Sequence, residues 1–71
     1  MLVELDLHGI QHHFVKDMVE NFILTNWDKM PLKIICGNST PMKELVWEVL
    51  RKHSLSYYVD GRNLGALIIG K

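Results

Sequence analysis

Hydrophobic and polar residues alternate with a period that changes several times along this 71-residue chain. Residues 2–8 alternate with a period of two, which predicts a strand with one buried face, and Gly9 ends that strand. In two longer segments the apolar residues recur at i, i+3, i+4, i+7 and i+8, which indicates a helix with one core-facing stripe. The stripes are Val15, Met18, Val19, Phe22 and Ile23 in residues 11–26, and Met42, Leu45, Val46, Val49 and Leu50 in a second helix.

The ends of the second helix can be read from its residue types. We expect Thr40 to be the N-cap and Pro41 to take the first helical position, where its missing N–H leaves no helical bond unmade. The basic cluster 51–53 suits the negative end of the helix dipole, and we expect His53 at the surface. Trp47 lies off the apolar stripe, so we expect it to pack against the first helix, with stacking on a base or a partner as the alternative.

Three shorter segments complete the pattern. Residues 32–36 are nearly all apolar, as in a central strand that is buried on both faces. Residues 56–59 and 64–69 also have the composition of strands. Asp60-Gly61 is a hairpin signal, which makes the last two strands antiparallel neighbours.

The resulting order, β-α-β-α-β-β, predicts an α+β fold built as a two-layer α/β sandwich. Because crossover connections are right-handed, we expect the first three strands to be parallel, with both helices on one face of a four-stranded mixed sheet. The hairpin then places the fourth strand between the second and the third, in the order 1-2-4-3. Such open sheets bind ligands at the carboxyl ends of their parallel strands, where we expect the loops 8–11, 37–40 and 60–63 to meet.

Composition and charge narrow the class of protein. Seventy-one residues leave room for one domain, residues 1–71, and a hydrophobic content of 48% predicts a globular core. The single cysteine, Cys36, excludes an internal disulfide and fits a reducing, cytoplasmic setting. No apolar run approaches the roughly 18 residues of a membrane span, and Glu4 and Asp6 interrupt the apolar start, unlike a signal peptide. The formal net charge is zero, so any binding of phosphates would depend on a local patch.

Asp6 and His8 are the candidate catalytic residues. They lie two positions apart on the first predicted strand, so we expect both on one face. The opposite face, which we expect to meet the helices, holds Val3, Leu5 and Leu7. A carboxylate beside an imidazole fixes its tautomer and raises its basicity, which suits a general base or a phosphate ligand. The alternative is a polar strand end whose carboxylate satisfies a neighbouring loop.

The candidate phosphate-binding loop consists of Gly37, Asn38, Ser39 and Thr40. It leads from a buried strand into a helix N-terminus, where backbone N–H groups and the helix dipole attract an anion and the hydroxyls add donors. It lacks the lysine and the spacing of a P-loop, which argues against a nucleoside triphosphate. The candidate cations that would steer a phosphate are Lys43, in the first turn of the helix, and Arg62, in the hairpin.

His12 and His13 open the first helix and form, with His8, a cluster of three imidazoles within six residues. We expect this cluster, together with Gly9, to face a phosphate or the solvent. No second acidic residue or cysteine stands at a suitable ligand spacing beside it. We therefore expect neither a metal ion nor another cofactor.

Three segments together resemble a known family. Leu5-Asp6-Leu7-His8-Gly9 is similar to the LDLHG motif with which Smr (small MutS-related) domains begin their first strand-to-helix turn. Residues 34–39 stand where that family carries a Thr/His-Gly-X-Gly loop before its second helix. Residues 63–69 resemble the family's closing strand, so the resemblance covers nearly the whole chain in the right order.

The resemblance implies a fold like the C-terminal domain of initiation factor three, and binding to RNA or DNA. In the family such binding often accompanies DNA-nicking or RNA-cleaving endonuclease activity. The second motif departs from the family's, because Cys36 replaces the Thr/His and Ser39 stands where the second glycine belongs. That glycine permits a positive φ, which serine tolerates poorly and Asn38 more readily. We therefore expect nucleic-acid binding, whereas the sequence leaves endonuclease activity open.

Two other functions stay open. The first is a non-catalytic adaptor, because an apolar patch on the sheet face away from the helices would be covered by a homodimer or a larger protein partner. The residues expected on that face are Ile35, Leu67 and Ile69; an alternation displaced by one residue would instead give Ile34, Ala66 and Ile68. The second is a small enzyme that acts on a phosphorylated metabolite in the same cleft.

Overall fold

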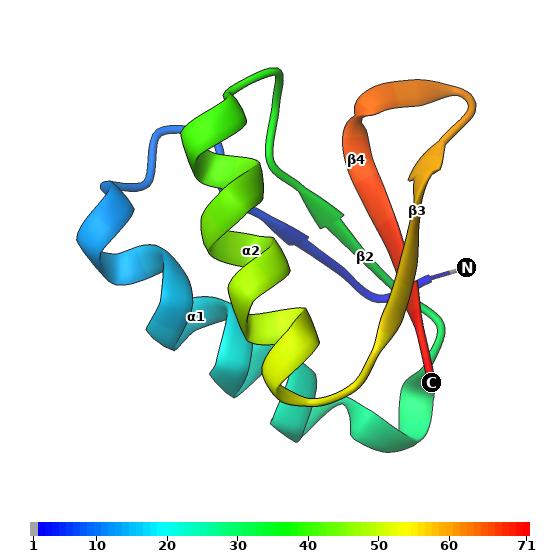
Figure 1. Cartoon of the computed structure of the whole chain (residues 1–71). Coiled ribbons are helices and arrows are strands. Elements are labelled where there is room, and N and C mark those ends of the chain that lie inside the picture. The colour runs from blue at the N-terminus through cyan, green and yellow to red at the C-terminus, as the bar shows by residue number, and fades with distance from the viewer. Residues whose placement is uncertain (1) are drawn as a thin grey trace.

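The helices and strands follow one another in the order that the sequence predicts. The computed structural model describes residues 2–71, except for the side chains of Asn63 and Leu64 at the start of the predicted closing strand. Its elements are β1 (Glu4–Asp6), α1 (His12–Thr25), the 3-10 turn η1 (Trp27–Lys29), β2 (Leu32–Ile35), α2 (Thr40–Lys52), β3 (Ser56–Asp60) and β4 (Asn63–Gly70). Figure 1 shows them in chain order, from blue to red.

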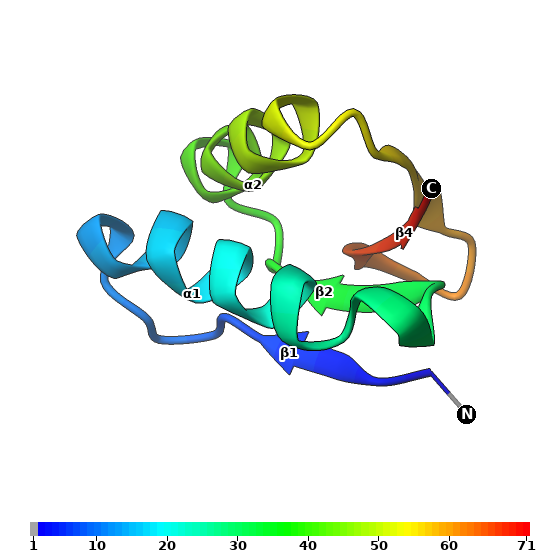
Figure 2. The ribbon, with the colours of Figure 1, turned by 90° about the horizontal axis from the view of Figure 1, so that it is seen from below.

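The strands form one mixed sheet in the predicted order, β1-β2-β4-β3. β1 runs parallel to β2, and β4 runs antiparallel to both of its neighbours, β2 and β3. Both helices cover the same face of this sheet (Figure 2), so the predicted α+β sandwich is confirmed. Because the first two strands are parallel, the loops that follow them leave the sheet on the same side, at the carboxyl ends of these strands.

The hydrophobic core lies between the helices and the sheet. Both predicted helical stripes supply it, although Met18, Phe22 and Leu45 lie partly buried at its margin. The buried helical residues are Val15, Val19 and Ile23 of α1 and Met42, Val46, Val49 and Leu50 of α2. The buried side chains on the sheet side of this cluster are Leu7, Ile34, Cys36, Leu67 and Ile69.

Two predictions about which side chains face the helices were wrong. Leu67 and Ile69 are fully buried in the core, because Leu67 lies opposite Ile34 in the ladder. The residues of β2 and β4 on the other face are Lys33, Ile35, Ala66 and Ile68. Alternation along one strand shows that every second side chain lies on the same face. Which of the two sets faces the helices depends on the register with the neighbouring strand. Val3, also expected against the helices, precedes β1 and is 37% exposed.

Serines flank α2 on both sides, Ser39 as the N-cap and Ser54 just beyond the C-cap His53. Ser39, and not Thr40, is the N-cap: its hydroxyl accepts from the Met42 N–H at 3.3 Å, and Lys43 N–H donates to the Ser39 carbonyl. Thr40 is instead the first helical residue. At the other end Ser54 has a φ of +56° and donates to the Arg51 carbonyl, while Leu55 N–H reaches the Leu50 carbonyl, a Schellman ending.

Trp47 lies on α2 beside the edge strand β3. Its ring stacks on Tyr57 with centroids 5.9 Å apart and planes 20° from parallel. The predicted packing against α1 was therefore wrong, because α2 lies over the side of the sheet that ends in β3 (Figure 2). Neither helix of the described residues is long and apolar enough to cross a membrane.

Candidate functional site

The turn after β1 is the first part of the candidate site. Gly9 has a φ of +76°, which glycine adopts without strain, and Ile10 N–H closes the turn on the Leu7 carbonyl at 3.0 Å. The Asp6 carboxylate accepts a hydrogen bond from the His8 backbone N–H at 2.8 Å. Among the described residues its partner is thus a backbone amide, and not the imidazole. Asp6 holds the turn, and the side chain of His8 is exposed.

α1 begins next to this turn without a side-chain cap. Gln11 occupies the N-cap position, but among the described residues its side chain makes no capping hydrogen bond. His12 and His13 are exposed in the first turn, which contains no acidic residue. The His13 ring lies against Phe14, with centroids 4.1 Å apart. The unbonded N–H groups and the positive end of the helix dipole are therefore left to the solvent or an anion.

The loop after β2 is tied to β4. Cys36 and Gly37 donate their backbone N–H groups to the Gly65 carbonyl at 2.8 and 2.9 Å, and Gly37 has a φ of +67°. The Cys36 thiol donates to the same carbonyl oxygen at 3.4 Å. Burial raises the pKa of this thiol, and the nearby charge of Lys43 offsets part of that rise. Cys36 is therefore a buried structural thiol and does not have the environment of a nucleophile.

Residues 38–43 lead into α2 and form its first turn, and they differ in exposure and in hydrogen bonding. The Ser39 hydroxyl oxygen accepts the Met42 N–H as the helix cap, a bond that orients the side chain but does not use its O–H proton as a donor. Asn38 and Thr40 are exposed, and Lys43 is half-buried one turn into the helix. The first turn of α2, like that of α1, contains no acidic residue. Lys43 is thus a cation at a helix N-terminus with no ion pair among the described residues.

The β3–β4 hairpin carries the third predicted part of the site. Asp60 accepts the Arg62 backbone N–H at 3.0 Å and pairs with Lys33 at 3.3 Å. The Arg62 backbone bond is the main cause of a lowered pKa at Asp60, followed by the interaction with Lys33. Arg62 itself is exposed, and its charge lies near that carboxylate. Arg62 is therefore a weaker attractor for a phosphate than its position alone suggests.

The structure brings two of the three predicted loops together. β1 and β2 are paired neighbours with Asp6 opposite Ile35, so the β1 turn (residues 6–10) and the loop 37–40 lie side by side (Figure 1). The hairpin lies farther along the same edge, two to three strand spacings or about 10–15 Å from β1. We call the β1 turn, the loop 37–40 and the first turns of both helices the N-terminal edge.

One property of this edge was missed in the sequence, although it was readable there. The first turns, 12–14 and 40–43, contain no Asp or Glu, so neither helix dipole is neutralised by a carboxylate in its own first turn. The edge also gathers the imidazoles of His8, His12 and His13. The carboxylate of this edge, Asp6, accepts the His8 backbone N–H, and Glu4 extends from β1 on the open face of the sheet.

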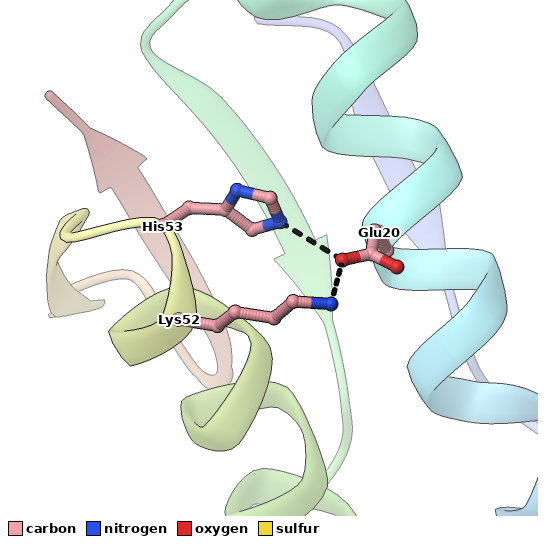
Figure 3. A network of polar contacts seen from close by, with 3 residues as sticks. All are labelled: Glu20, Lys52 and His53. Atoms are coloured by element: carbon pink, nitrogen blue, oxygen red, sulfur yellow. Dashed lines mark hydrogen bonds and ion pairs between the residues drawn. The ribbon is translucent and has the colours of Figure 1, made fainter.

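The principal polar cluster between the helices lies away from this edge. Glu20 of α1 accepts hydrogen bonds at one carboxylate oxygen from Lys52 at 2.7 Å and from His53 at 3.0 Å (Figure 3). His53 is therefore half-buried between the helices and is not a free surface residue. A shallow groove of about 310 Å³ beside this cluster is lined by Lys16, Asp17, Glu20, Glu48, Val49 and Lys52. Within the described residues, no three His, Cys, Asp or Glu side chains are grouped to hold a metal ion.

Comparisons of the chain with protein-family models, with curated proteins and with solved structures found no match.

Proposed function

We propose that this chain is an Smr-like domain that binds RNA or DNA through phosphates at the N-terminal edge. The observation that carries the proposal is that the Asp6-Leu7-His8-Gly9 turn and the loop 37–40 lie side by side, and each leads into a helix whose first turn has no acidic residue. Backbone N–H groups at helix N-termini bind phosphate oxygens, and an unneutralised pair of dipoles strengthens that attraction.

The residues of the edge have separate roles in this proposal. His8, His12 and His13 donate ring N–H groups to phosphate oxygens, and Lys43 supplies the fixed positive charge. Asn38 presents its backbone N–H to the nucleic acid. Gly37, whose own N–H is bonded to the Gly65 carbonyl, provides the positive φ of the loop, and Ser39 acts indirectly by capping α2. Asp6 is a positioning residue, because its carboxylate fixes the His8 backbone. If cleavage accompanies binding, His8 is the group at this edge that moves a proton.

The shape of the edge favours a polymer over a small metabolite. Three hollows in the described surface are lined by other residues, and none of them includes a residue of the N-terminal edge. Small ligands usually bury most of their surface in an enclosed pocket, whereas a phosphate backbone crosses an open surface. The third function considered above, a phosphorylated metabolite as substrate, therefore has less support.

Fluorescence anisotropy with single-stranded RNA and DNA at low salt tests the proposal. We expect His8→Ala and Lys43→Gln each to weaken binding on the order of fivefold, the effect of losing one phosphate contact. Lys29→Gln, in η1 beyond the opposite end of α1, is the matched control and should bind like the wild type. Absence of binding to every nucleic acid tested would refute the function, and unchanged affinity in both edge variants would refute the site.

A second pair of variants separates positioning from chemistry at Asp6. Asp6→Asn keeps a side-chain oxygen that accepts the His8 N–H, whereas Asp6→Ala removes it. We expect binding to survive in Asp6→Asn and to weaken in Asp6→Ala. Equal losses in the two variants would mean that the negative charge, and not the turn, is what the edge requires. Any nuclease activity should disappear in His8→Ala while circular dichroism stays native.

A further inference from the structure

A surface apart from the N-terminal edge is the outer edge of β3. Within the described residues this strand pairs with β4 alone, so one side of its backbone faces the solvent. Its central side chains are also open: Tyr57 is 39%, Tyr58 65% and Val59 47% exposed. No proline or lysine interrupts the strand, although both are common devices that prevent an edge from pairing, and the irregularity in its pairing with β4 begins only after Val59.

The hydrogen-bonding pattern identifies which backbone groups point outward. Cys36 donates to Gly65 directly opposite, so this position of the β2–β4 ladder is a hydrogen-bonded pair. Hydrogen-bonded and non-hydrogen-bonded pairs alternate along an antiparallel ladder. The N–H and C=O groups of Leu67 and Ile69 therefore point toward β2, and those of Ile68 point toward β3. Ile68 lies opposite Tyr58, so the Tyr58 backbone points inward. Tyr57 and Val59 therefore present their N–H and C=O groups at the free edge.

This edge is complementary to itself. If a second copy runs antiparallel with Tyr58 opposite its own counterpart, the outward groups of Tyr57 meet those of Val59, and each pair exchanges both hydrogen bonds. Ser56 then lies opposite Asp60, whose charge is already countered by Lys33 at 3.3 Å. No like charges face each other across such a pairing.

The other edge of the sheet lacks this complementarity. β1 consists of Glu4, Leu5 and Asp6, so two antiparallel copies centred on Leu5 would place Glu4 opposite Asp6. Like charges directly opposite each other destabilise a strand pair. The distribution of charge therefore separates a protected edge, β1, from an unprotected one, β3.

We propose that β3 is a homodimer interface, at which a second copy of this chain pairs antiparallel and continues the sheet across a two-fold axis at Tyr58. The two Tyr58 rings would lie side by side on the open face of the sheet, beside Ile68. This surface differs from the apolar face considered in the sequence, and it leaves the N-terminal edge free. An interface limited to one strand edge is small, so we expect a dimer of micromolar or weaker affinity.

Sedimentation velocity from micromolar to millimolar protein tests the proposal. The wild type should shift from monomer to dimer, and Tyr58→Glu should weaken the dimer on the order of tenfold, since it places two carboxylates opposite each other. An equimolar mixture of Tyr58→Glu and Tyr58→Lys should form mixed dimers, because opposite charges then face across the axis. Leu24→Glu, at a 57% exposed position on α1, is the control and should dimerise like the wild type.

Amide hydrogen exchange on the wild type gives a readout that depends on no variant. The Tyr57 and Val59 amides should be protected at high protein concentration and exchange quickly when the protein is dilute. The Tyr58 amide should be protected at both concentrations, because it bonds to β4. A monomer throughout the range, or a dimer that is indifferent to Tyr58→Glu and leaves the Tyr57 and Val59 amides unprotected, would overturn the proposal.

Discussion

At the scale of one residue, Ser39 belongs to the candidate phosphate-binding loop, but its observed role is to stabilise the start of α2. Its hydroxyl caps α2, while the side chain of Thr40, one position later, is exposed and makes no capping hydrogen bond to the described residues. Ser39→Ala should therefore lower the free energy of unfolding by about 1 kcal/mol, the usual cost of losing such a cap. Thr40→Ala should change it by less than about 0.5 kcal/mol. Urea titration of both variants measures the difference, and a larger loss in Thr40→Ala would contradict the observed cap.

Positions of single residues were more predictable than their partners. The sequence placed Asp6 and His8 at the end of the first strand, because alternation and Gly9 mark that end. The hydrogen bond from the His8 amide to Asp6 was the alternative interpretation, and only coordinates distinguish a backbone partner from an imidazole two residues away. Ser39 and Thr40 are equally good caps by type, so the sequence could not choose between them either.

Helices and strands were predictable wherever one face is buried and the other is not. Both helices and the first strand have such a pattern, and their existence, order and pairing follow from it. β4 lies between two strands and is buried on both faces from residue 65 to 69. Its sequence therefore has no alternation of apolar and polar residues that would show which side chains face the helices. This is why the facing of Leu67 and Ile69 was wrong, and why the register with β2 had to come from the structure.

The contact between the helices depends on pH through Glu20. Hydrogen bonds from Lys52 and then from His53 lower the pKa of this carboxyl. Because the folded state holds the proton less tightly than the unfolded state, this contact stabilises the protein above the ordinary glutamate pKa. The contribution disappears as the pH falls through that value to the folded one.

Glu20→Gln should therefore lower the midpoint of thermal unfolding at pH 7, and the difference from the wild type should narrow below about pH 4. Glu44→Gln, an exposed glutamate of α2, is the control and should show no such pH-dependent difference. Calorimetry at a series of pH values measures both. A difference that persists unchanged at acid pH would mean that Glu20 stabilises the helix pair by packing and not by charge.

At the scale of the whole molecule, zero net charge conceals an uneven distribution. In the described part of the chain, three of the eight Lys and Arg residues form ion pairs: Lys16 with Glu48, Lys33 with Asp60 and Lys52 with Glu20. The open sheet face carries carboxylates from β1 and β3, whereas the N-terminal edge has, beside the Asp6 carboxylate, Lys43, three imidazoles and two helix N-termini. The sum of these charges follows from composition alone, but their separation depends on which residues the sheet register and the starts of the helices bring together.

This distribution predicts a weak but measurable salt dependence. With Lys43 at the N-terminal edge and Arg62 in the neighbouring hairpin as the fixed cations, the logarithm of the affinity for single-stranded nucleic acid should fall with the logarithm of salt concentration with a slope of about −1.4 or shallower. Lys43→Gln should reduce that slope by about 0.7, because one fewer phosphate is neutralised, whereas Lys29→Gln should leave it unchanged. Anisotropy titrations across a salt series measure all three slopes. A wild-type slope steeper than about −4 would require more cations than this edge contains, and would place the nucleic acid on another surface.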